Sequence, residues 1–391
     1  MAESFGYSVA DFFFTQTAGK EKMLMMFKNS MNYPLLRLFT IFLFITLLSI
    51  GCGGGSGGGD DDDDDDNGSS YLNLLDGTYF LAMLADTGSD NWNQMNEVEF
   101  DGTGNLDSSI VYDSDGDTGS FSGTYDISAD RSFTFAGSDV EGILSPDGNM
   151  MITIDSDPTD SDTEILIGAA VAASTGSDDT LLSGTYVLCQ IRHDGDAVKA
   201  TRINATFDGA GAFTGTIADD SDDGPGTVGA LAGTYAVAAN GRLDMTITGL
   251  PKSFDGFVAP DGESLVIIDD DDDGEVLLMV GVKASSGNNL ASLNGTYQVH
   301  VFGGDDSSAW ATLVDGTFDG AGTLSSDIIS DSDNDLTDPP DRSYSVGDDG
   351  TLDFGTTNER GMVSPSGDIF VVGDAENTDS EVSIVIGIKK S

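Results

Sequence analysis

Aspartate is the residue type with the greatest capacity for chemistry in this chain of 391 residues. It gathers in acidic loops that recur along the sequence, and carboxylate oxygens at alternate positions of a tight loop suit Ca²⁺. We predict weak calcium binding by two sets of loop aspartates: Asp113, Asp115, Asp117, Asp219, Asp220, Asp222, Asp331, Asp333 and Asp335 in the first, and Asp155, Asp157, Asp269, Asp271 and Asp273 in the second. The prediction depends on the recurrence of these clusters at equivalent loops.

None of these loops is a complete EF-hand. Asp269, Asp271, Asp273 and Gly274 match the opening of such a loop, but Val280 stands where the closing Glu is needed. We therefore expect affinities no tighter than those of extracellular modules, with dissociation constants of about 0.1–1 mM. The alternative is that the loop aspartates are solvent-exposed, bind no metal and keep the protein soluble.

The sequence contains no recognisable catalytic arrangement. Its two histidines, His193 and His300, lie at different distances from the starts of their repeats, so no Ser-His-Asp or Cys-His device is indicated. No Cys and His cluster has the spacing of a zinc site. Among so many acids some close carboxylate pair is inevitable, so a glycosidase-like pair carries little weight. We predict that the protein is not an enzyme.

An apolar leader ends at a cysteine near the start of the chain. Residues 38–50 are apolar, basic residues precede them, and Gly51 stands directly before Cys52. A basic region, an apolar run and a small residue in this order form a secretory signal. Residues 1–51 are therefore predicted to be a signal peptide, with more ordinary start codons in the range 25–31.

This ending resembles the lipobox of bacterial lipoproteins, with Gly51 and Cys52 in the expected places and Ser49 where Leu is usual. The resemblance implies that Cys52 carries the lipid, such as palmitate, and becomes the mature N-terminus. By the same resemblance Gly53 favours the outer membrane over retention at the inner one, and the early acidic run resembles the surface-export signals of some lipoproteins. Residues 52–70 are predicted to be a flexible tether, because seven consecutive aspartates and many glycines cannot bury a core.

The net charge of the chain limits the classes of partner that it can bind. Removal of the leader, with three acids and four bases, leaves 65 acids and 11 bases, a formal net charge of −54. Such a surface repels nucleic acid, and we predict no nucleic-acid partner. The remaining cysteine, Cys189, has no intramolecular disulfide partner once Cys52 is acylated, and its apolar surroundings predict a buried, inert thiol.

The chain contains three copies of one module, which we place at residues 71–175, 180–285 and 290–391. Each copy opens on a Gly-Thr-Tyr triplet, and a Phe-Asp-Gly-x-Gly turn follows 23 residues after that Gly, at 100–104, 207–211 and 318–322. Several landmarks in one order at nearly equal spacing are the signature of a repeat.

Alternation of apolar and polar residues between Asp-Gly and Asn-Gly turns predicts an all-β fold of short antiparallel strands. About eight such runs in each unit favour three tandem meanders that close into small eight-stranded barrels. In strand number and rhythm they weakly resemble lipocalins. The alternative is a single six-bladed β-propeller. The last strand of each unit is apolar on both faces; these strands are expected at 165–171, 276–282 and 382–388. Each should pack against a neighbouring unit or against another element of its own domain.

These observations predict a lipid-anchored, non-enzymatic envelope or surface protein with a structural, adhesive or binding role, whose partner is an envelope protein or a glycan. One alternative is a carrier of small apolar ligands, with barrel interiors lined by Tyr79, Tyr186 and Tyr297. A carbohydrate-active hydrolase is a third reading, without specific support. Calcium is the single cofactor indicated.

The calcium prediction can be tested by thermal melts of residues 71–391 in EDTA, in millimolar Ca²⁺ and in matched Mg²⁺ at constant ionic strength. A site occupied at 100 times its dissociation constant adds about 2.7 kcal/mol to the free energy of unfolding. We expect a rise in melting temperature with Ca²⁺ alone. Equal melts in all three solutions would leave the loops as solvated acid.

Overall fold

The computed structural model describes residues 71–391 except 87–90, 137, 139, 157–162, 171–177, 195–196, 222–223, 251, 270–274, 306–307, 334–338, 356–358, 376–380, 391 and the side chains of 194 and 224–228. The predicted signal peptide 1–51, the lipidation site Cys52 and the tether 52–70 lie outside the described residues. All described residues belong to one compact unit. None of the helices described in it is long and apolar enough to cross a membrane.

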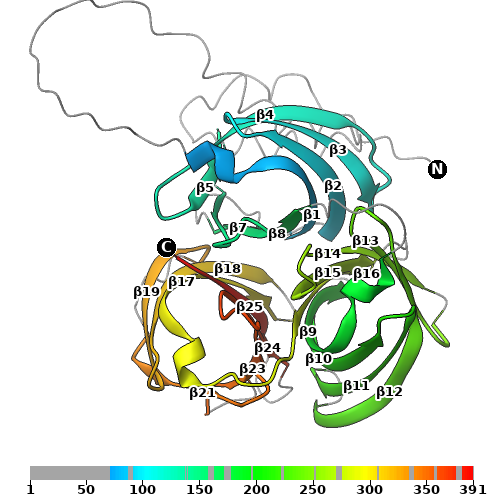
Figure 1. Cartoon of the computed structure of the whole chain (residues 1–391), viewed down its shortest axis with the longest axis vertical. Coiled ribbons are helices and arrows are strands. Elements are labelled where there is room, and N and C mark those ends of the chain that lie inside the picture. The colour runs from blue at the N-terminus through cyan, green and yellow to red at the C-terminus, as the bar shows by residue number, and fades with distance from the viewer. Residues whose placement is uncertain are drawn as a thin grey trace, which may run out of the picture. The chain divides into compact units, whose positions relative to one another are not determined.

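The first repeat is a closed antiparallel barrel in which each strand pairs with the next and the last pairs with the first (Figure 1). A short 3₁₀ turn precedes the strands. The elements are η2 (Tyr71–Leu74), β1 (Asp76–Asp86), β2 (Asn91–Asp101), β3 (Asn105–Asp113), β4 (Ser120–Ile127), β5 (Ser132–Phe135), β6 (Glu141–Leu144), β7 (Met150–Asp155) and β8 (Thr163–Ala170).

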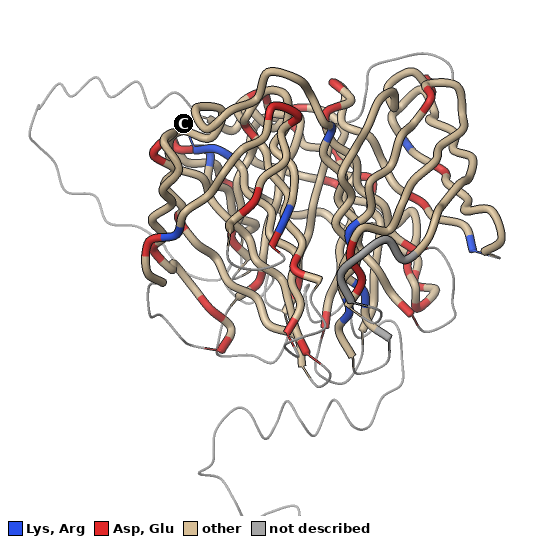
Figure 2. Tube along the Cα trace, turned by 90° about the horizontal axis from the view of Figure 1, so that it is seen from below, with Lys and Arg blue, Asp and Glu red and all other residues tan. Residues whose placement is uncertain are grey.

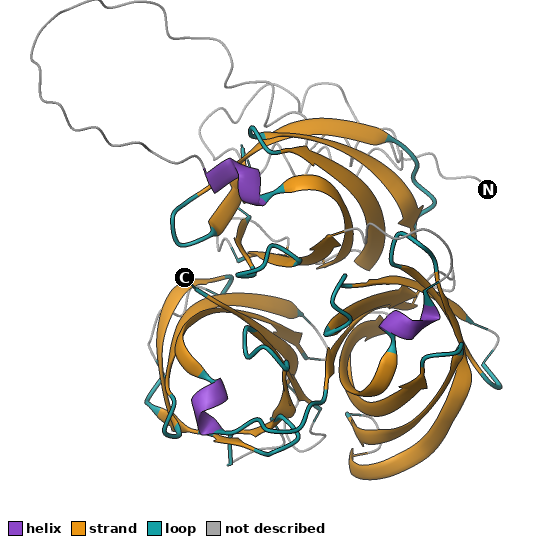
Figure 3. Cartoon of the chain, in the orientation of Figure 1, coloured by secondary structure: helices purple, strands orange, loops and turns teal. Residues whose placement is uncertain are grey.

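The second repeat forms a closed barrel of the same order (Figure 3). Its elements are η3 (Asp179–Leu181), β9 (Ser183–Asp194), β10 (Ala197–Asp208), β11 (Ala212–Asp220), β12 (Gly224–Val237), β13 (Arg242–Ile247), β14 (Ser253–Val258), β15 (Ser264–Asp269) and β16 (Glu275–Lys283). The prediction of eight-stranded antiparallel barrels is thereby confirmed for the first two repeats, and the propeller alternative is wrong because the strands close on themselves instead of forming separate blades.

The third repeat is a nine-stranded sheet that nearly closes. The two ends of this sheet, β20 and β21, flank Tyr344 and are two pieces of what is the fourth strand in the other barrels. Pro339 and Pro340 precede them, and a proline cannot supply the N–H that a longer strand would need there. The elements are η4 (Leu290–Ser292), β17 (Asn294–Gly304), β18 (Ala309–Asp319), β19 (Thr323–Asp331), β20 (Arg342–Ser343), β21 (Ser345–Val346), β22 (Thr351–Asp353), β23 (Arg360–Val363), β24 (Ile369–Asp374) and β25 (Val382–Lys389).

The Phe-Asp-Gly-x-Gly turns are held by their aspartates. In the first, the Oδ1 atom of Asp101 accepts hydrogen bonds from the backbone N–H groups of Thr103 and Asn105, at 2.7 and 2.9 Å. Both glycines of this turn have positive φ, 66° at Gly102 and 101° at Gly104, where a side chain would be strained. Asp208 and Asp319 make the equivalent bonds, and the pKa of each of these carboxyl groups is lowered by them.

The last strand of each unit contributes to two hydrophobic cores. On β16, Leu277 and Met279 face the interior of their own barrel, whereas Val276, Leu278 and Val280 face outward into a cluster with residues of the other two barrels. We call this cluster the shared core. It is formed mainly by outward side chains of the first, second, seventh and eighth strands of all three barrels, including Ile165 and Ile167 of β8 and Ile384 and Ile386 of β25.

The three contacts between barrels use equivalent strands. β1 and β2 of the first barrel lie against β15 and β16 of the second, β9 and β10 lie against β24 and β25, and β17 and β18 lie against β7 and β8. Each barrel therefore offers its first two strands to one neighbour and its last two to the other. Of the two alternatives that the sequence left open for the final strands, the structure shows packing against a neighbouring unit.

A pair of adjacent substitutions tests the shared core. Leu278 is 0% exposed although it lies on the outer wall of its barrel, and Leu277 is 5% exposed on the inner wall. We expect Leu278→Ala and Leu277→Ala each to lower the free energy of unfolding by about 2–5 kcal/mol, because both leave cavities. Chemical denaturation of residues 53–391 measures this.

The control is Leu250→Ala, at a residue that is 50% exposed. Its effect should stay within about 0.5 kcal/mol. If Leu278→Ala behaved like this control and not like Leu277→Ala, the barrels would not share a core.

Candidate functional site

One aspartate in each loop of the first set has a structural role that repeats in the three barrels. Asp113, Asp220 and Asp331 accept side-chain hydrogen bonds across the second and third strands from Gln94, Thr201 and Thr312, at 2.6, 3.4 and 2.7 Å. A β-bulge lies at the equivalent place in each of these strand pairs. The serine after each aspartate accepts a backbone N–H bond across the same pair, and these serines are Ser114, Ser221 and Ser332. The recurrence of these aspartates therefore has a structural explanation.

The structure places the other described candidates in separate settings. The backbone N–H groups of Asp115, Asp117 and Asp333 donate to the preceding loop aspartates, Asp155 ends β7, Asp219 pairs with Arg202, and Asp269 pairs with Lys252. Asp157, Asp222, Asp271, Asp273 and Asp335 lie outside the described residues. In the described part of the chain, no three His, Cys, Asp or Glu side chains come together as a metal site. Calcium binding stays a prediction.

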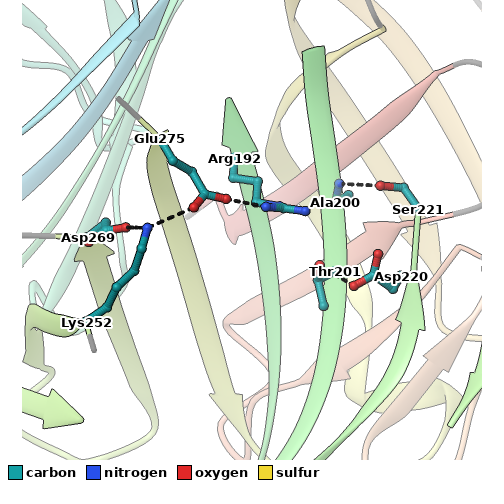
Figure 4. A network of polar contacts seen from close by, with 8 residues as sticks. All are labelled: Arg192, Ala200, Thr201, Asp220, Ser221, Lys252, Asp269 and Glu275. Carbon is teal, nitrogen blue, oxygen red and sulfur yellow. Dashed lines mark hydrogen bonds and ion pairs between the residues drawn. The ribbon is translucent and has the colours of Figure 1, made fainter. Parts of the chain in front are cut away.

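A network of ion pairs lies at one end of the second barrel (Figure 4). Lys252 Nζ lies 2.9 Å from Asp269 Oδ2 and 2.8 Å from Glu275 Oε2, and Glu275 also pairs with Arg192. Burial alone would raise the pKa of Glu275, but the hydrogen bonds from Lys252 and Arg192 lower it below its usual value. Asn93 of the first barrel donates to the backbone oxygens of Asp269 and Leu277, both at 3.2 Å. The network thus joins two barrels, and a calcium ion at Asp269 would compete with Lys252.

The barrel interiors are occupied by aromatic side chains at the end where the 3₁₀ turns lie. In each barrel two tyrosines pack against one phenylalanine, with ring centroids 5.0–5.4 Å apart and steep interplanar angles. The hydroxyls of Tyr79, Tyr186 and Tyr297 donate to carbonyls of the glycine turns at 2.7, 2.6 and 2.5 Å, and burial raises the pKa of all three. The second tyrosines, Tyr125, Tyr235 and Tyr344, donate to carbonyls at the 3₁₀ turns. The tyrosines that the carrier reading assigned to a ligand cavity are thus engaged in internal packing.

An open hollow of about 450 Å³ lies on the outer wall of the second barrel, over β12, β13 and β14. Asp244 and Asp255 are cross-strand partners in it, and Arg242 Nη2 lies 2.8 Å from Asp255 Oδ2. Burial, and then the neighbouring Asp244, raise the pKa of Asp255 to about 6. The pair can therefore hold a proton near neutral pH. The register of β13 and β14 brings these two acids together. Because the sequence does not reveal that register, it could not predict the pair.

No family model and no curated protein matches this chain. Among solved structures it is similar to transferrin binding protein B from serogroup B Neisseria meningitidis, with 11% identity over 81% of this chain and 76% of that one, at a TM-score of 0.26. A double mutant of the same kind of protein from Haemophilus parasuis matches at 12% identity, 80% and 75% coverage, and a TM-score of 0.26. A protein of unknown function from Nostoc punctiforme matches at 8% identity, 82% and 99% coverage, and 0.20. Likenesses at these TM-scores are distant and carry no argument about function.

The carboxylate pair in the hollow gives a pH-dependent prediction. In Asp244→Asn, we expect the pKa of Asp255 to fall from about 6 but to stay above 3.8, because burial, the larger cause, remains. Arg242→Gln should raise it, because a stabilising positive charge is lost. Carbon-13 NMR titration of the side-chain carboxyl measures both, and no change in either variant would contradict the assignment.

The raised pKa of Asp255 sets the direction in which the stability of the fold changes with pH. Between pH 3.8 and about 6 the folded state holds a proton that the unfolded state has lost, so this pair contributes less stability as pH rises through about 6.

Proposed function

We propose that the protein is a lipid-anchored, non-enzymatic binding platform of the bacterial outer membrane or cell surface. The observation that carries this proposal is the shared core, which joins three barrels, each with its own hydrophobic core, into one compact unit. Because aromatic side chains occupy the barrel interiors, this unit is poorly suited to carry a small ligand. It can instead hold a set of loops in fixed positions relative to one another. Placing binding loops on a rigid scaffold is a common use of β folds.

The strand directions separate the anchor from the acidic loops. The tether joins the first barrel at η2, which the Tyr125 hydroxyl holds through the carbonyl of Leu72 at 3.2 Å. β1 runs from this end to Asp86, which pairs with Asn91 and Thr163 at the other end. Asp113 and Asp155 terminate β3 and β7 at that same far end. Asp113 and Asp155, which begin the acidic loops, therefore lie at the end of this barrel opposite Tyr71, the residue to which the proposed tether is attached.

The charge indicates the chemistry of the partner. Figure 2 shows acidic residues along the whole tube and far fewer basic ones. A surface of this kind attracts cationic groups and speeds their association at low ionic strength. We therefore propose a partner with a basic face, either an envelope protein or a glycan with cationic groups, with Ca²⁺ as an additional ligand of the loops.

The ion pairs of the described acids support a role without catalysis. Two buried acids of the predicted calcium loops, Asp219 and Asp269, are neutralised by Arg202 and Lys252. A paired carboxylate is less able to act as a base or nucleophile. The anchor itself is proposed from Cys52, where two or more acyl chains would hold the protein stably on a bilayer.

The proposal is tested in cells that express the full chain and are fed an alkyne analogue of palmitate. We expect the wild type to incorporate the analogue and to be cut by protease added to intact cells. Cys52→Ser should lose both properties, because it lacks the acylated sulfur. Gel fluorescence after click labelling and immunoblotting give the readouts.

The matched control is Cys189→Ala. Cys189 is buried in the shared core, and Ala82 stands at the equivalent place in the first barrel, so the substitution suits the site. This variant should keep the label and the surface exposure. Label that is absent from the wild type, or retained in Cys52→Ser, would refute the anchor, and protection from protease would refute the surface location.

A further inference from the structure

The two histidines of the chain are buried beside the shared core, His193 near the end of its strand and His300 midway along its own. His193 is on β9 and His300 on β17, the first strands of the second and third barrels. They have the same outward orientation as Ile191 and Phe302, which belong to the shared core, and they are 1% and 0% exposed. None of their four ring nitrogens has a hydrogen-bond partner. An imidazole buried in this way is an unusual choice for an apolar interface.

His193 contacts or approaches all three barrels. Its cross-strand neighbours on the second barrel are Val198 and Val276. From the third barrel, the ring of Phe302 lies 6.1 Å from its own. From the first barrel, Asp86 is the carboxylate that faces it, with Oδ2 3.8 Å from Nδ1, too far for a hydrogen bond. Burial lowers the pKa of His193 although Asp86 opposes this effect.

His300 lies in a more apolar place. Its cross-strand neighbours are Leu313 and Ile386, and β7 of the first barrel packs against its strand with Ile152 and Ile154 in the shared core. The charged group that acts on it is Lys390, a cation. Burial, and then this cation, lower the pKa of His300 to about 3. No described carboxylate compensates a charge on this imidazole in the way that Asp86 does for His193.

The interiors of the barrels are independent of this interface. Each barrel has its own core, with its own tyrosines and phenylalanine bonded to its own turns. A positive charge on an outward-facing histidine therefore destabilises the contact between barrels more directly than it destabilises the interior of any barrel.

We propose that the shared core is a proton-operated latch, in which protonation of His193 and His300 separates the barrels without unfolding them. The proposal depends on the shared core alone and not on the anchor or the binding role proposed above. Open barrels would let water reach both imidazolium ions, whereas the closed arrangement buries them.

The direction of the effect is set by the lowered pKa of both groups. Above pH 6.5 both states are neutral at these positions, and the closed arrangement has its full stability. Below pH 6.5 the open state binds protons first, so each histidine shifts the equilibrium toward it by about tenfold per pH unit until the closed state is also protonated. The effect should appear between pH 6.5 and 4.5, above the range in which ordinary carboxyl groups titrate.

Cys189 provides the measurement. It is fully buried in the shared core, and a Cβ placed on Gly373 of the third barrel would lie 3.2 Å from its sulfur, so separation of the barrels must expose it. In residues 53–391 it is the sole thiol. We would measure its rate of reaction with 4,4′-dithiodipyridine from pH 7.5 to 4.5, divided by the rate for the same chain in urea, and record far-ultraviolet circular dichroism in parallel.

We expect the normalised rate to rise by up to about a hundredfold per pH unit below pH 6.5 while the β-sheet signal stays constant. His193→Gln and His300→Gln should each reduce the slope toward tenfold, and the double variant, which contains no histidine, should lose it. Gln keeps a neutral polar group of similar reach that cannot be protonated.

Three results would overturn the proposal. The rate could be constant with pH, or it could rise equally in the double variant, which would assign the effect to carboxyl groups. The β-sheet signal could also be lost with the same midpoint as the thiol reaction, which would mean global unfolding. If the variants do not fold, the wild-type rate and its β-sheet signal still distinguish opening, no opening and unfolding.

Discussion

The burial of both faces of a few strands is the constraint on which this structure depends. A small barrel fills its own interior and would normally leave its outer wall to water. Here the first and last strands of each barrel are apolar on the outer wall as well, as Leu84 and Ile165 are in the first barrel. That surface cannot remain exposed, and three barrels that each offer one side to each neighbour cover it completely. The assembly of the three barrels into one compact unit follows from this one requirement.

The three contacts are similar in geometry but different in chemistry. At equivalent places the first barrel has Met95 and Tyr112, the second has Arg202 and Asp219, and the third has Leu313 and Ser330. Arg202 Nε lies 2.8 Å from Asp219 Oδ2, whereas Ser330 shares a hydrogen bond of 2.5 Å with Ser156 of the first barrel. A buried ion pair adds little net stability, but different residues at the equivalent places of the three contacts help each barrel distinguish its correct neighbour.

Similar geometry in the three barrels also explains why acidic loops recur in the sequence. Their recurrence in the sequence suggested a common ligand, and part of that recurrence comes from the bulge that Asp113, Asp220 and Asp331 stabilise in each barrel. A repeated fold repeats its turn chemistry, so recurrence of a polar residue is first evidence of shared local structure. The carboxylate pair of Asp244 and Asp255 occurs once, with Thr134 and Glu141 at the corresponding place in the first barrel, and it is therefore specific to the second barrel.

The three repeats, the antiparallel all-β fold and the two-sided burial of the final strands could be predicted from the sequence, which favoured barrels over a propeller. Each of these depends on local periodicity and turn residues, such as Asp101 with Gly102 and Gly104, which act within a few positions of the chain. The side-chain contacts between repeats could not be predicted and became visible in the folded protein. His193 and Asp86 lie 3.8 Å apart although more than 100 residues separate them, and neither has a neighbour in sequence that indicates the other. The apolar outer wall predicts that a partner exists, but apolar contact has no direction, so the identity of that partner depends on how three barrels fit together.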